Sequence, residues 1–148
     1  MALTPNEELF HQASKNGDLS QMKNILTKFI NSKDEYGKTP IHNAADNGDS
    51  NMVDYLIVNG AEVNVPDQRG WTPIHFAVYE GHTEVAKCLI EKGATVDAIT
   101  NGGATPLYVA SQNGHNEVAK FLIENGATID AKAQFDQRGS FTKLLRRS

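Results

Sequence analysis

The feature that most constrains the fold of this chain is an internal repeat of 33 residues. Threonine–proline pairs recur at that spacing, as Thr39-Pro40, Thr72-Pro73 and Thr105-Pro106, and nine of the twelve glycines follow it. Residues 67–99 match residues 100–132 at 18 of 33 positions. Self-similarity at a fixed spacing is the signature of a stacked repeat protein. We therefore expect a solenoid in which each unit packs against its neighbours.

Each repeat carries the local signals of two short helices. Threonine before proline is typical of a helix N-cap and first helical residue, because the hydroxyl caps an amide and proline has no amide to cap. Small apolar residues follow at helical spacing until Gly48, which tolerates a positive φ and ends the first helix. A second apolar helix ends at Gly60. Residues 61–70 are too few for another helix, so we expect an extended, finger-like turn.

These repeats resemble the ankyrin-repeat family. The resemblance rests on two motifs: Thr-Pro-Ile-His-x-Ala at 39–44 and 72–77, and Gly-His-x-Glu-Val at 81–85 and 114–118. The resemblance implies a mainly α fold, an ankyrin-repeat solenoid of stacked helix-turn-helix units with β-hairpin-like fingers. In the family a histidine supports the finger by hydrogen bonding. Tyr108 stands where the other repeats have His42 and His75, so the third finger is expected to be held differently.

The 148 residues are expected to form a single ankyrin-repeat domain. We divide it into a degenerate N-capping repeat (5–33), full repeats (34–66, 67–99 and 100–132) and a partial C-capping segment (133–148). The end segment has an alternative interpretation, a truncated fourth repeat of a longer protein. The N-terminus lacks the basic start and apolar stretch of a signal peptide, and no apolar run is long enough for a membrane helix. With a single cysteine, Cys88, these features favour a cytoplasmic or nuclear protein that binds no membrane.

The sequence offers little for catalysis, and we expect no enzyme activity. The five histidines fall at two structural positions of successive repeats, too far apart for one zinc ion, so no metal site is expected. Residues 101–105 are glycine-rich but lack the lysine of a phosphate loop, so neither a cofactor nor a small-molecule substrate is predicted. We interpret Cys88 as a thiol packed in the repeat rather than a nucleophile. Acidic residues outnumber basic ones by 18 to 14, which disfavours nucleic acid as a partner.

The resemblance instead implies another protein as the partner, bound on the concave face of fingers and first helices by a chain expected to be monomeric. Positions that the repeat framework leaves variable predict the contact residues: Tyr36, Lys38, Asp46, Asn47, Gln68, Arg69, Trp71, Tyr79, Glu80, Gln112 and Asn113. Trp71 and Tyr79 should be exposed, because sister repeats place lysine, aspartate or glutamine at their positions. The alternative is that Trp71 lies across its own finger.

Two further expectations concern charge and modification. Residues 34–66 carry a net charge of -5, which suggests a partner segment with lysine or arginine near an apolar anchor. Asn64 resembles the finger asparagine that ankyrin-directed hydroxylases modify, so it is a candidate hydroxylation site. The function that fits is an adaptor, scaffold or inhibitor without chemistry of its own. The alternative is a targeting or regulatory domain cut from a larger enzyme or channel.

Overall fold

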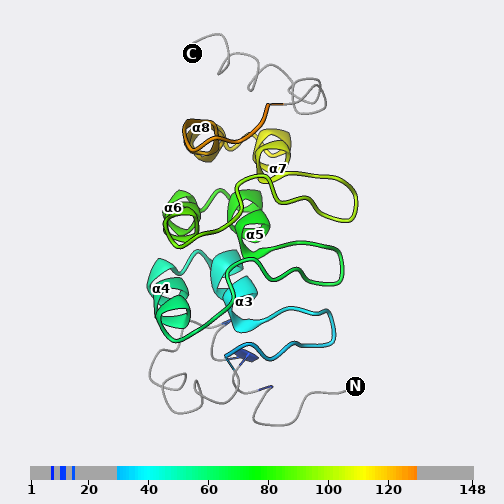
Figure 1. The fold of residues 1–148 in the computed structure, drawn as a ribbon, viewed down its shortest axis with the longest axis vertical. Helices are drawn as coiled ribbons and strands as arrows, with labels where there is room; N and C mark the ends of the chain where they lie inside the picture. Colours follow the sequence, from blue (N-terminus) through cyan, green and yellow to red (C-terminus); the bar gives the residue numbers. More distant parts are fainter. Residues whose placement is uncertain (1–7, 9–10, 13–14, 16–29, 130–148) are drawn as a thin grey trace.

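A computed structural model describes residues 8, 11, 12, 15 and 30–129 of the chain. The described residues form helices in pairs: α3 (Pro40–Asn47) with α4 (Ser50–Val58), α5 (Pro73–Tyr79) with α6 (Thr83–Glu91), and α7 (Pro106–Gln112) with α8 (Asn116–Glu124). The pairs stack along one axis, with α3, α5 and α7 as an inner row, α4, α6 and α8 as an outer row, and the fingers projecting beyond the inner row (Figure 1). The predicted mainly α repeat solenoid is confirmed.

The first helix of each repeat begins where the threonine–proline pairs predict. Thr39, Thr72 and Thr105 are extended N-caps, and proline follows as the first helical residue. In the third repeat the Thr105 hydroxyl accepts the Tyr108 amide at 3.1 Å. Because the cap residue adopts an extended conformation, the chain turns sharply from the finger into the helix.

The core runs along the stack as a repeated set of apolar side chains. Ile41, Ile74 and Leu107 occupy equivalent positions in the inner row and are fully buried, and so are Ala44 and Ala77. Alanine at the inner positions lets neighbouring first helices pack closely, because a larger side chain there would hold them apart. Each repeat therefore completes its core only with the next repeat.

The fingers are hairpin-like turns joined to one another by backbone hydrogen bonds. In the second finger the Asp67 amide donates to the Trp71 carbonyl at 2.9 Å, and the Gly70 amide donates to the Asp67 carbonyl at 3.0 Å. Between fingers, the Gln68 amide donates to the Tyr36 carbonyl at 3.0 Å. None of the described residues is assigned to a strand. The fingers thus form a hydrogen-bonded row along the stack.

A buried histidine in each of the first two full repeats holds the finger of the following repeat. The His42 Nε2–H donates to the Trp71 carbonyl at 2.9 Å, and His42 Nδ1 accepts the Thr39 amide at 3.0 Å. His75 likewise reaches the Ala104 carbonyl at 3.1 Å. The expectation for Tyr108 concerns the finger after the third full repeat, and it stays a prediction. The residues at the corresponding spacing from Tyr108 lie beyond residue 129, outside the described residues.

A second set of histidines packs against the ends of the inner helices of the preceding repeats. His82 Nε2 lies 3.0 Å from the Asp46 carbonyl, and His115 Nε2 lies 2.9 Å from the Tyr79 carbonyl. Each ring covers a glycine of the preceding repeat with positive φ. A Cβ on Gly48 would lie 2.7 Å from the His82 ring. Glycine is therefore required there by backbone conformation and by close packing together.

The division into one domain of capped repeats stays a prediction. The N-capping repeat over 5–33 falls mostly, and the C-capping segment over 133–148 entirely, outside the described residues. Within the first of these, His11 is buried, and its Nε2 lies 3.1 Å from the Ser32 hydroxyl. Among the described residues, no helix has the length and apolar character needed to cross a membrane.

We expect Gly81→Ala to destabilise the protein more than Gly93→Ala. Both glycines have positive φ, +76° and +100°, so both variants carry a backbone cost of about 1–2 kcal/mol. At Gly81 the new Cβ would also lie 2.6 Å from His115 Nδ1, whereas no described atom lies within 4 Å at Gly93. Displacing His115 should cost a further ~1 kcal/mol through its lost hydrogen bond.

Urea unfolding monitored by circular dichroism measures both free energies of unfolding. The control is the same Gly81→Ala substitution made in a His115→Ala background, where the ring is absent and only the backbone cost should remain. Equal losses for Gly81→Ala and Gly93→Ala would contradict the steric part of the argument.

Acid should weaken the fold through His42. Burial lowers the pKa of His42 from 6.5 to about 4, so the folded protein keeps this ring neutral. The unfolded chain therefore binds more protons at mildly acidic pH. The contribution of His42 is complete above pH 6.5 and is lost as the pH falls toward 4. Between pH 7.5 and pH 5 the expected loss is about 2 kcal/mol.

The measurement is the free energy of unfolding of the wild type and His42→Gln across this pH range. The variant should be less stable at neutral pH, because the finger loses its support, and its stability should fall less with acid. Burial also lowers the pKa of His75, so a shallower dependence should remain in the variant. Parallel pH profiles of the two proteins would show that His42 is not the titrating group.

Candidate functional site

Among the hollows that the described residues line, two lie next to each other on the concave face, which the fingers form with α3, α5 and α7. The finger hollow, of about 340 Å³, lies between the first two fingers and is lined by Tyr36, Lys38, Asp67, Gln68 and Arg69. The aromatic hollow, of about 210 Å³, lies beside it and is lined by Asp46, Arg69, Trp71, Phe76, Tyr79 and Glu80. Arg69 lines both, so the two hollows form one continuous site.

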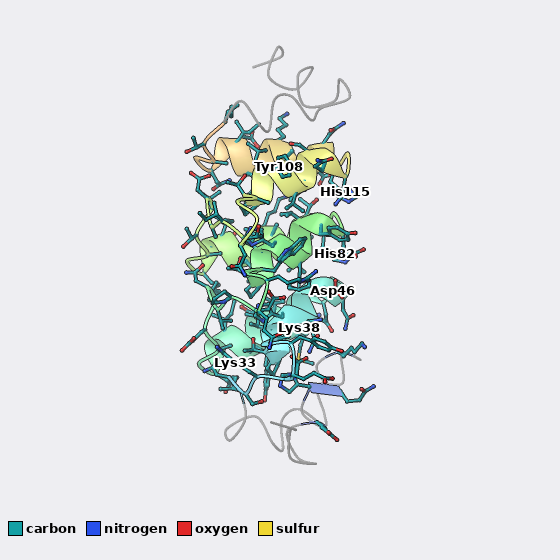
Figure 2. All side chains as sticks on the ribbon, turned by 90° about the vertical axis from the view of Figure 1, so that its right-hand side faces the viewer. Lys33, Lys38, Asp46, His82, Tyr108 and His115 are labelled. Carbon is teal, nitrogen blue, oxygen red and sulfur yellow. The ribbon has the colours of Figure 1, made fainter. Side chains whose placement is uncertain are left out.

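Most of the predicted contact residues come together here. Eight of them line the two hollows: Tyr36, Lys38, Asp46, Gln68, Arg69, Trp71, Tyr79 and Glu80. Asn47, Gln112 and Asn113 line neither. Asp46 lies with His82 and His115 along one edge of the stack as seen from the fingers, where the inner helices end (Figure 2). The site is thus built mainly from the first and second full repeats.

Trp71 is the centre of an aromatic cluster. Its ring centroid lies 5.4 Å from that of Phe76, 5.6 Å from that of Tyr79 and 5.7 Å from that of His75. The expected exposure of Tyr79 is confirmed at 48%. Trp71 differs from the expectation, because it is only partly exposed and packs against the core. The finger backbone places the Trp71 indole against α5, and the ring contacts there hold it in one orientation.

Two cations lie over this cluster. The Arg69 guanidinium carbon is 4.9 Å from the Trp71 ring centroid, and Lys38 Nζ is 5.1 Å from that of Phe76. Both distances are within the range of cation–π attraction. The site therefore presents aromatic rings with positive charges already placed against them.

Asp67 organises the finger that carries Arg69 and Trp71. Its side chain is 2% exposed, and one carboxylate oxygen accepts the backbone amides of Arg69 and Trp71 at 2.8 and 2.9 Å. The other oxygen lies 3.6 Å from Arg69 Nη2. Asp34 plays the same backbone role in the first finger, accepting the amides of Tyr36 and Lys38. These bonds fix the backbone from which the contact side chains project.

Two residues of the site were missed by sequence reasoning, Phe76 and Asp67. Phe76 is 7% exposed and lies beneath Trp71, although sister repeats carry Asn43 and Val109 at its position. That variation is also the signal that could have revealed it, since a position free to vary is not needed by the stack. Asp67 had a clearer signal, because aspartate begins two successive repeats, at 34 and 67.

The predicted residues of the third repeat have other contacts. The Asn113 side-chain amide donates to the Tyr79 carbonyl at 3.3 Å, and the Gln112 amide donates to the Tyr108 hydroxyl at 2.7 Å. Asn47 is exposed at the end of α3. These residues border the site without lining its hollows.

Asn64 belongs to a row of side chains that join successive repeats. Its amide nitrogen donates to the Gly93 carbonyl at 3.1 Å, and its oxygen accepts the Thr95 amide at 2.8 Å. Asn31 makes the equivalent pair of bonds one repeat earlier, and Asp97 accepts the Thr128 amide one repeat later. The exposed Asn64 thus has a structural role, and its hydroxylation stays a prediction that intact-mass measurement tests.

The histidines and Cys88 take part in packing. The ring nitrogens of His42, His75, His82 and His115 reach backbone carbonyls of adjacent repeats. Cys88 is half-buried, and burial together with the charge of Asp54 raises the pKa of its thiol, which lowers its reactivity. Within the described part of the chain, no three metal-ligating side chains come together.

The comparison with known protein families agrees with this architecture. A family model described as ankyrin repeats in three copies matches residues 10–99 and, in a second overlapping match, residues 42–133. The matched residues include all the described helices and both hollows. Ankyrin repeats are generally protein–protein interaction modules, and the family is typically non-catalytic. This chain belongs to the ankyrin-repeat family.

Proposed function

We propose that this protein is a non-catalytic interaction module, an adaptor, scaffold or inhibitor, that binds a partner protein through its concave face. The observation that carries the proposal is the cluster of Arg69, Trp71 and Tyr79, which lines the aromatic hollow and reaches the finger hollow through Arg69. Tryptophan, tyrosine and arginine are the residues that most often dominate binding energy at protein interfaces. Here they lie together on one face.

The arrangement also favours binding because its side chains are already ordered. Trp71 packs against three aromatic rings, and Arg69 is held between the Trp71 ring and the Asp67 carboxylate. A partner that docks on ordered side chains pays less conformational entropy than one that must immobilise them. The partly open hollows on either side of Arg69 can receive side chains of the partner.

The sister repeats supply a second line of support. At the position of Arg69 the sister repeats carry Tyr36 and Gly102. At the position of Tyr79 they carry Asp46 and Gln112. The stack is built equally well with each of these residues, so its packing does not require arginine or tyrosine. Residues that the framework does not need are free to serve recognition.

Affinity capture from a lysate tests the proposal. We expect the double variant Arg69→Ala/Tyr79→Ala to lose a specific partner, with binding weakened by about thirtyfold or more if these residues form the hot spot. Trp71 is left in place, because its partial burial against the core means that its removal would also disturb the fold.

Val58→Ala is the matched control, because Val58 is an exposed apolar residue, 70% accessible, at the end of the outer helix α4. This variant should retain the partner, and circular dichroism should show all three proteins equally folded. If the concave-face double variant captures every partner as well as the wild type does, the proposal is wrong.

A further inference from the structure

We propose that the aromatic hollow receives a lysine or arginine side chain from the partner, next to an apolar residue of the same segment. This inference rests on the proposed function, since it names the chemistry of the partner. Its first support is the pair of carboxylates that line the hollow, Asp46 near the end of α3 and Glu80 just after α5. The described residues form three ion pairs, and neither carboxylate takes part in them.

The cation within the hollow does not cancel these two charges. Arg69 is paired with Asp67, whose carboxylate oxygen lies 3.6 Å from Arg69 Nη2. Lys38 lines the finger hollow, with its Nζ 5.1 Å from the centroid of the Phe76 ring that lines the aromatic hollow, so its single charge offsets only part of the charge of the two carboxylates. The aromatic hollow therefore keeps an excess of negative charge. A basic side chain complements that excess, whereas a carboxylate would meet Asp46 and Glu80.

The aromatic walls favour the same occupant. The Arg69 guanidinium lies 4.9 Å from the Trp71 ring and 5.8 Å from the Phe76 ring. A cation of the chain therefore already takes these two rings, and Tyr79 is the aromatic residue of the hollow left for the partner. The Tyr79 ring stands nearly edge-on to Trp71 and is 48% exposed. A lysine or arginine stem can pack on Tyr79 while its charged end lies toward a carboxylate.

The backbone adds a smaller contribution of the same sign. The inner helices α3 and α5 both end beside the hollow, and a helix C-terminus carries partial negative charge. The helix ends and the two carboxylates therefore act in the same direction on an incoming cation. The electrostatic attraction of these groups for a cation acts over a short range, and salt should screen it.

Selection from a random peptide display library on the full chain tests the inference. We expect the selected peptides to be enriched in lysine or arginine beside an apolar residue. Synthesised peptides would then be titrated by calorimetry and by the fluorescence of Trp71, the single tryptophan of the chain. Asp46→Asn/Glu80→Gln should weaken their binding by about fivefold to tenfold, with a smaller effect at high salt.

Glu91→Gln/Glu124→Gln is the matched control, because it removes two exposed carboxylates from the outer helices α6 and α8. It changes the net charge equally and should leave binding within about twofold of the wild type, since charges farther than a Debye length from the peptide are screened.

Two results would overturn the inference, and they differ in what they say of the proposed function. Peptides that are neutral or acidic, or that bind the carboxylate variant unchanged, yet lose binding in Tyr79→Ala, would overturn the basic partner and leave the concave face as the binding site. Selected peptides that bind Tyr79→Ala as well as the wild type would contradict both.

Discussion

The interaction on which the rest of this structure depends is the hydrogen bond from a buried histidine to the finger of the next repeat. His42 reaches the Trp71 carbonyl, which also accepts the Asp67 amide that closes the second finger. The finger is thereby fixed relative to α3 as well as to its own helix. Burial lowers the pKa of the ring, which keeps it neutral, with Nδ1 free of a proton to accept the Thr39 amide. One side chain thus caps a helix and couples two repeats.

This coupling explains why a chain with only a thin core can present a defined surface. The inner helices pack through alanine, isoleucine and leucine, and the second finger adds the buried side chain of Val65 to the same core. Beyond this apolar contact, the fingers are positioned by polar contacts across the stack: the histidines, the Asn64 row and the backbone bonds between fingers. Buried polar groups with their partners in place specify one arrangement, because any other would leave them unsatisfied.

The site follows from the same principle. Asp67 fixes the finger backbone and pairs with Arg69, and the finger turns Trp71 onto Phe76 and Tyr79. Contacts within the chain thus place Arg69 and Trp71 on this face, and Asp46 and Glu80 add charge at its border. Its character differs from that of the third repeat, where Gln112 and Asn113 bond within the stack or to Tyr108. Repeats of one backbone can thus carry different surfaces.

The sequence by itself determined the repeat period, the helix starts at Thr39, Thr72 and Thr105, and the positive-φ glycines that follow. These features are local, because capping and the φ preference of glycine depend on a few neighbouring residues. It also predicted most residues that line the two hollows, because positions that vary between repeats stand out against the framework.

Only the tertiary structure decided which finger each histidine holds, how far Trp71 is buried, and that Phe76 lies beneath it. The physical reason is distance along the chain. His42 and Trp71 are 29 residues apart, and their contact forms only when one repeat docks on the next. A local pattern specifies the backbone of each unit, whereas the environment of a side chain between units depends on how those units stack.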